Sequence, residues 1–211
     1  MKKLFCLDNK FFSFMTKVAD VMILNILFIM TCIPVITIGA SLTALYSVTL
    51  RQSAGKSAYV ASEYLHAWKE NFKQSTIVWC FLMIVFGLFF MNLNVPAEAS
   101  GYQIMRVLLI ISFVFTIMIF LYIFPLLAKF ENTIKHTLVN AFLMSVRHLM
   151  TTCILFGTAV FFVLITFLYP AMIEINAMLW FLFLFAGIAR IQSDFLNKVF
   201  NRYIVEEAEC C

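Results

Sequence analysis

Long hydrophobic runs alternate with short polar segments along this chain. The first run covers residues 18–50 and contains one charged residue, Asp20. As one straight helix this run would reach roughly 50 Å, whereas the hydrocarbon core of a bilayer is about 30 Å thick. Pro34 lacks a backbone donor and disfavours helical angles at the preceding residue. The pattern therefore predicts two helical arms, 18–33 and 37–50, joined by an irregular elbow at 34–39.

The rest of the chain contains four hydrophobic runs that we predict to be transmembrane helices. They cover 75–95, 104–128, 149–169 and 175–190. Segment 58–73 is amphipathic, with Trp68 and Phe72 on its apolar face. It predicts a helix half-sunk in the inner leaflet and anchored by these two rings. Segment 1–17 is expected to lie on the inner interface, and 191–211 to form a cytoplasmic tail that begins as a helix.

Composition narrows the class of protein. Of 211 residues, 64% are hydrophobic and 12% are charged, too few charges for a soluble domain to cover its apolar surface. A transmembrane barrel is excluded because the apolar runs are continuous and do not alternate in polarity. The prediction is an all-α, polytopic helical membrane bundle of one domain. It combines a proline-broken N-terminal hairpin, four transmembrane helices and amphipathic inner elbow helices.

The distribution of the net charge of +4 predicts a topology. Lys and Arg gather within 2–17, 51–73, 129–147 and 190–202, whereas the connections 94–103 and 170–176 contain neither Lys nor Arg. The positive-inside rule places the basic clusters and both termini in the cytoplasm. The chain must then cross an even number of times between 1–17 and 51–73. The hairpin meets this requirement either as two tilted crossings or as a re-entrant loop that enters and leaves on the same side.

The elbow is the best candidate for a binding site. A broken membrane helix is tolerated only where protein or a watery cavity satisfies its free backbone groups, and such breaks often line substrate sites. The alternative is a structural hairpin tip packed on its neighbours. The candidate residues are Thr31, Pro34, Thr37, Gly39, Ser41, Thr43 and Tyr46.

Three further polar residues lie in or near apolar runs. Arg106 and Glu174 both lie near the predicted outer face, where they either pair across two helix ends or each face water and headgroups. Asn25 lies in the middle of the first arm and is expected to form a hydrogen bond to another helix.

No pattern of reactive side chains indicates catalysis. His66, His136 and His148 lie in inner polar segments without the carboxylate and Cys companions of a metal or catalytic site. Cys32, Cys80 and Cys153 are expected to pack as small hydrophobic residues. We therefore expect no catalytic residue, no metal, no cofactor and no nucleic-acid partner.

Three segments resemble the YesL-type bacterial membrane proteins, a family known as domain of unknown function 624. They are KKLFCLDNKFFSFMTKVADVMILNILFIMTCIPVITIGASLTALYSVTL, EYLHAWKENFKQSTIVW and DFLNKVFNRY. The resemblance implies an integral protein of the bacterial plasma membrane, with genes often near those for carbohydrate uptake. It implies an accessory or modulator of an ABC-type sugar transporter. The alternative is a small-solute transporter that uses the Pro34–Gly39 elbow as its substrate site. Expected partners are the lipid bilayer and either transporter subunits or further copies of the chain.

Overall fold

The chain is helical throughout the part that the computed structural model describes, residues 10–56, 59–93, 102–168 and 173–209. The elements are α1 (Lys10–Cys32), the 3₁₀ turn η1 (Val35–Thr37), α2 (Ile38–Ser53), α3 (Val60–Leu93), α4 (Tyr102–Lys129), α5 (Ile134–Arg147), α6 (Leu149–Leu168), α7 (Ile173–Leu179), the π-helix η3 (Trp180–Leu184) and α8 (Phe185–Glu209). The predicted all-α class is confirmed. Predictions for residues 1–9, 57–58, 94–95, 169 and 210–211 lie outside the described residues.

Within the described residues, five helical segments are long and apolar enough to cross a membrane. They are Phe14–Cys32, Val60–Asn92, Ile104–Lys129, Leu149–Leu168 and Ala177–Tyr203. Helix α2 has 16 residues, which corresponds to about 24 Å and is short for a full crossing. The crossing or re-entrant nature of the α1–α2 hairpin stays a prediction.

Several segments predicted as separate elements are continuous in the structure. The amphipathic segment and the first span after it form one helix, α3, of 34 residues, because Val60–Leu93 contains no proline and its first glycine is Gly87. Helix α1 begins at Lys10, so the end of the predicted interfacial segment continues directly into the first arm. The predicted last span continues in the same way through η3 into α8.

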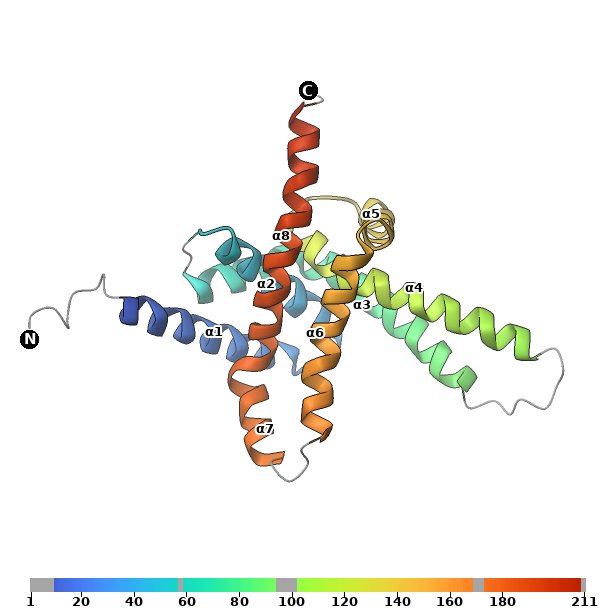
Figure 1. Cartoon of the computed structure of the whole chain (residues 1–211), viewed down its shortest axis with the longest axis horizontal. Helices are drawn as coiled ribbons and strands as arrows, with labels where there is room; N and C mark the ends of the chain where they lie inside the picture. Colours follow the sequence, from blue (N-terminus) through green and yellow to red (C-terminus); the bar gives the residue numbers. More distant parts are fainter. Residues whose placement is uncertain (1–9, 57–58, 94–101, 169–172, 210–211) are drawn as a thin grey trace, which may run out of the picture.

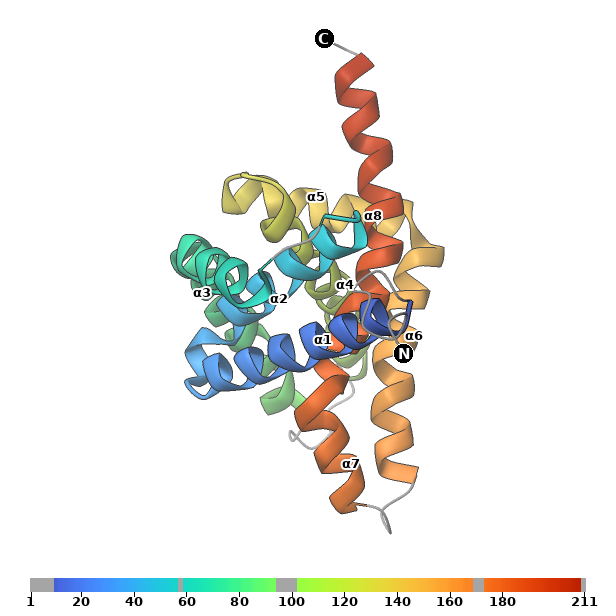
Figure 2. The same ribbon diagram turned by 90° about the vertical axis from the view of Figure 1, so that its left-hand side faces the viewer.

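The helices radiate from a shared centre and do not form one parallel bundle (Figures 1 and 2). Helix α1, the α3–α4 hairpin and the α6–α7 hairpin project from this centre in three different directions. Helix α2 occupies the centre, where it packs against α1, α3, α4 and α8. A helix of only 16 residues is thus the one against which four of the others pack.

Small side chains let α2 lie at this centre. Its buried residues are Gly39, Ala40, Ser41, Thr43, Ala44, Leu45, Ser47, Val48, Thr49 and Leu50. Small residues allow helix backbones to approach closely, which favours van der Waals packing in a membrane. The two backbones approach closely at Gly39, where a Cβ atom would lie 2.6 Å from both the Ser75 carbonyl oxygen and the Trp79 Cβ. One turn on, the hydroxyls of Thr43 and Ser75 form a buried hydrogen bond of 2.8 Å.

Two hydrophobic clusters flank α2, and α2 contributes to both. One joins it to α1, the start of α3 and α8: Leu24, Phe28, Ala44, Leu45, Val48, Val60, Tyr64, Ala67, Ala186 and Ala189. The other joins its end to α3, α4, α5, α6 and α8: Leu50, Val78, Leu82, Tyr122, Ile123, Phe124, Leu126, Leu127, Ala141, Met144, Leu155, Leu196, Val199 and Phe200. The outer parts of the two hairpins lie beyond these clusters and expose apolar side chains.

Gly39→Ala is expected to destabilise the fold by about 1–3 kcal/mol, the usual cost of overpacking a close contact. The added methyl would push α2 away from the α3 backbone at Ser75. The matched control is Gly87→Ala, where nothing lies within 4 Å of the added atom. That change should leave stability equal or raise it by about 0.5–1 kcal/mol. Thermal unfolding in detergent measures both, and equal midpoints for the two variants would contradict the close approach.

Candidate functional site

The proline elbow is closed by hydrogen bonds from within the protein. Helix α1 ends at Cys32, and the Thr37 amide donates to the Pro34 carbonyl at 2.9 Å. The Thr37 hydroxyl lies 2.6 Å from the Thr31 carbonyl and 2.7 Å from that of Pro34. The Trp79 indole N–H, from α3, donates to the Val35 carbonyl at 2.9 Å. Carbonyls freed by the helix break are therefore satisfied by neighbouring side chains, as membrane burial requires.

The other predicted elbow residues also use their polar atoms internally. The Thr31 hydroxyl lies 2.6 Å from the Tyr64 hydroxyl. Ser41 and Thr43 donate to carbonyls one turn back in α2, at 3.0 Å each. The Tyr46 hydroxyl donates to Gln192 Oε1. Thr31 lies near the end of α1, Pro34 and Thr37 lie in the elbow, and the remaining predicted residues lie on α2: Gly39, Ser41, Thr43 and Tyr46. Their contacts favour a structural hairpin tip. Substrate binding there stays a prediction.

A polar seam joins α2 to α8, and sequence reasoning missed it. Its members are Tyr46, Thr49, Leu50, Arg190, Gln192, Ser193 and Asn197. Ser193 donates to the Thr49 hydroxyl at 2.8 Å, and the Asn197 amide donates to the Leu50 carbonyl at 2.8 Å. Arg190 donates to the Thr49 carbonyl at 3.1 Å, so a cation lies at the negative end of α2. The available sequence signal was the polar spacing of Gln192, Ser193 and Asn197.

Asn25 caps the π-helix in the middle of the last helical run. Its side-chain amide donates to the carbonyls of Trp180 at 2.9 Å and Phe181 at 2.6 Å. Its Oδ1 accepts from the Ala186 amide at 2.9 Å. A π-helix shifts the backbone register, which leaves such groups without their usual α-helical partners. Asn25 is fully buried, and the prediction that it bonds another helix is confirmed.

Asn25→Leu is expected to destabilise the fold by about 2 kcal/mol, because one buried amide and two partly buried carbonyls lose a partner, at up to about 1–3 kcal/mol for a buried group. Hydrogen exchange should accelerate at the amides around η3. Asn140→Leu, at an exposed position on α5, is the matched control and should change neither quantity. Thermal unfolding with exchange mass spectrometry measures both. Unchanged exchange at Ala186 in Asn25→Leu would contradict the cap.

The structure does not bring Arg106 and Glu174 together. Arg106 lies near the start of α4 and Glu174 near the start of α7, at the tips of two hairpins that diverge (Figure 1). No ion pair joins them; the ion pairs among the described residues are Arg51–Glu63 and His66–Glu70. Trp68 and Phe72 form an edge-to-face pair with ring centroids 4.9 Å apart. Trp68 packs against the cluster of α1, α2 and α8, and its role as an interfacial anchor stays a prediction.

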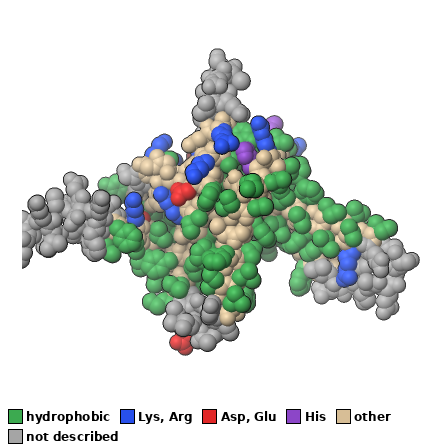
Figure 3. Space-filling view, in the orientation of Figure 1, with side chains coloured by type: hydrophobic (Ala, Val, Ile, Leu, Met, Phe, Trp, Pro, Cys, Tyr) green, Lys and Arg blue, Asp and Glu red, His purple; other side chains and the backbone are tan. Residues whose placement is uncertain are grey.

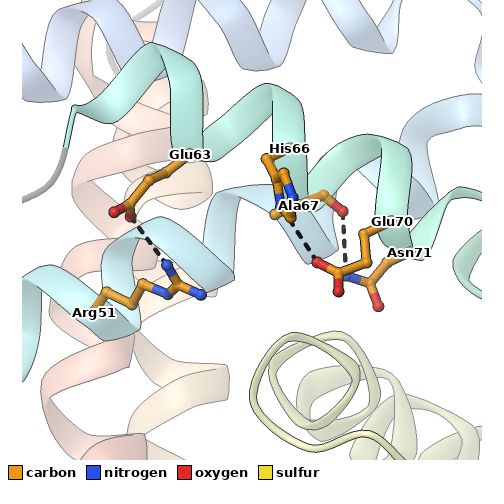
Figure 4. Close-up of polar contacts among 6 residues, drawn as sticks. All are labelled: Arg51, Glu63, His66, Ala67, Glu70 and Asn71. Carbon is orange, nitrogen blue, oxygen red and sulfur yellow. Dashed lines mark hydrogen bonds and ion pairs between the residues drawn. The ribbon is translucent and has the colours of Figure 1, made fainter.

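A cavity of about 410 Å³ lies between the first half of α3, the end of α2 and the end of α4. Its lining residues are Ser47, Arg51, Ser62, Glu63, His66, Ala67, Glu70, Asn71, Leu127, Ala128, Lys129, Phe130 and Glu131. We call it the charged cavity. Figure 4 shows side chains of α3 extending toward the space between α3 and α2. Arg51 lies 3.6 Å from Glu63, and His66 lies 3.5 Å from Glu70.

The charged cavity lies at the basic end of the molecule. On the face that Figure 3 shows, most Lys and Arg side chains lie in the upper part of the molecule, around α8, whereas the described part of the α6–α7 hairpin carries mainly hydrophobic side chains. Burial and the charges of Arg147 and Arg202 lower the pKa of His148 at this end, because both effects disfavour the imidazolium. Among the described residues, no three His, Cys, Asp or Glu side chains are grouped closely enough to hold a metal ion.

The five apolar helices define the class: a multi-pass helical membrane protein. The family model described as "Protein of unknown function, DUF624" matches residues 21–93. This segment covers most of α1, the elbow, α2 and α3, so the predicted resemblance is confirmed for this part of the chain. Comparison of the chain with the curated proteins and with the solved structures found no match.

Proposed function

We propose that this chain is a non-enzymatic membrane protein that packs against a carbohydrate uptake system of the ABC type in a bacterial plasma membrane, as an accessory or modulator. The observation that carries the proposal is the contrast between the centre of the fold, around α2, and the outer hairpins, α3–α4 and α6–α7. At the centre, polar side chains bond each other or the backbone, as in the Thr43–Ser75 and Ser193–Thr49 pairs. The outer hairpins expose apolar faces.

The outer hairpins offer the surfaces on which another membrane protein would pack. Along the outer part of α4, Val107 is 56% exposed and Leu108 is 60% exposed. Near the end of α6, Phe167 is 78% exposed. In a bilayer these faces contact lipid unless a second protein replaces it, and helix packing in membranes relies on such van der Waals contact. The carbohydrate role rests on the resemblance to the YesL-type family.

A transporter that uses the elbow as its substrate site is less well supported. Gly39 lies so close to Ser75 and Trp79 that even a methyl group would clash. The hydroxyls of Thr37 and Thr43 are already within hydrogen-bond distance of protein oxygens. Both observations favour a structural hairpin tip at the elbow over a substrate site. We also propose the topology from the charge pattern, with the basic end of Figure 3 and both termini in the cytoplasm.

Photo-crosslinking in native membranes tests the proposal. A photoreactive residue at Leu108 or Phe167, both exposed, should crosslink to the membrane subunit of a sugar transporter. The same residue at Ile111, which is 48% exposed on α4, maps how far the contact extends. Deleting the gene should lower uptake of that transporter's sugar several-fold, because the accessory contact is lost.

Two controls separate the proposal from its alternative. A photoreactive residue at Ala44, which is fully buried, should give no crosslink to another protein. The purified chain in proteoliposomes should take up none of the sugar by itself. Uptake by the chain alone would favour the transporter alternative, and unchanged uptake in the deletion strain would refute the accessory role.

A further inference from the structure

The acidic residues of the inner polar segments converge on the charged cavity. Segments 51–74 and 129–148 contain three carboxylates, Glu63, Glu70 and Glu131, and all three line the cavity. In the same segments Lys69, Lys73, Lys135 and Arg147 lie outside its lining. The cavity is therefore the place at this basic end where negative charge is concentrated.

Two of the carboxylates lack a permanent cationic partner. Glu63 faces Arg51 at 3.6 Å. Among the described residues, the ion-pair partner of Glu70 is His66, which is charged only when protonated. Glu131 forms no ion pair with a described residue. A ligand that supplies a positive charge would therefore gain attraction from Glu70 and Glu131 without displacing a Lys or Arg.

The opposite charge is present in the same cavity. Lys129 lines it and donates to the neutral amide oxygen of Asn197 at 2.7 Å, and Lys56 lies close enough for its like charge to act on Lys129. Arg51 keeps further guanidinium donors beyond its one contact with Glu63. These cations can accept an anionic group, for which the guanidinium fork and the ammonium are the usual protein donors.

We propose that the charged cavity binds a zwitterionic phosphate ester, with its ammonium at Glu70 and Glu131 and its phosphate at Arg51 and Lys129. The volume of about 410 Å³ lies in the range of small-molecule sites. A single metal ion does not fit, because no three described His, Cys, Asp or Glu side chains are grouped for one. A polyatomic ligand can reach carboxylates and cations that stand apart.

The ligand has two possible sources with the same chemistry. One is the headgroup of phosphatidylethanolamine, since Leu127, Ala128 and Lys129 end a candidate membrane span and place the cavity at the expected membrane boundary. The other is a soluble amino phosphate. This inference does not depend on the proposed role in carbohydrate uptake.

Native mass spectrometry of the full chain in detergent tests the proposal with three probes: phosphatidylethanolamine, phosphatidylglycerol and O-phosphoethanolamine. Phosphatidylethanolamine should bind about tenfold more tightly than phosphatidylglycerol, which lacks the ammonium; tenfold corresponds to one hydrogen bond to a charged group. O-phosphoethanolamine should compete with it. If O-phosphoethanolamine binds and the lipid does not, the ligand is the soluble amino phosphate. Equal binding of the two lipids, or binding of no probe, would overturn the proposal.

Matched variants locate the binding. Glu70→Gln and Glu131→Gln should each weaken binding of the amine-bearing probe about tenfold and leave the thermal midpoint unchanged, since neither residue pairs with a Lys or Arg. Glu174→Gln, an exposed carboxylate on α7, should bind like the unmodified chain. Unaltered affinity in both cavity variants would show that the ammonium does not bind there.

Discussion

The close approach of α2 and α3 is the contact on which the rest of the structure depends. Gly39 lets the two backbones meet at Ser75 and Trp79, and the Thr43–Ser75 hydrogen bond continues the contact one turn further. Because α2 is narrow, α8 and α4 can pack against its other faces. In a bilayer, where lipid solvates apolar side chains well, such close contact and internal hydrogen bonding replace much of the hydrophobic drive.

Several polar side chains at the centre satisfy backbone groups where a helix is broken or ends. Trp79 and Thr37 satisfy carbonyls at the proline elbow. Asn25 satisfies backbone groups at the π-helix, more than 150 residues away in the chain. The polar seam satisfies the end of α2. Two irregular segments that a membrane would otherwise disfavour are therefore stabilised by side chains from other helices.

This arrangement separates a closed centre from open surfaces. The elbow hydroxyls form hydrogen bonds to backbone carbonyls of the hairpin and to side chains of neighbouring helices. The charged cavity lies away from that closed centre, at the ends of α2 and α4, where side chains carry both signs of charge. The apolar hairpins form a third region, suited to lipid or to another membrane protein. The charged side chains of the cavity and the close helix contacts thus occupy different parts of one small chain.

The sequence by itself determined the helical class, the break at Pro34 and the apolar spans, because hydrophobic run length and proline chemistry act locally. It also indicated that Asn25 would bond another helix, since a lone amide in an apolar arm needs a partner. It could not show that partner to be a π-helix, because the two segments meet only when the chain folds. The divergence of the hairpins that carry Arg106 and Glu174 was likewise decided by packing around α2. Tertiary structure also decided that Glu63, Glu70 and Glu131 share a cavity, because their spacing along the chain carries no signal of that convergence.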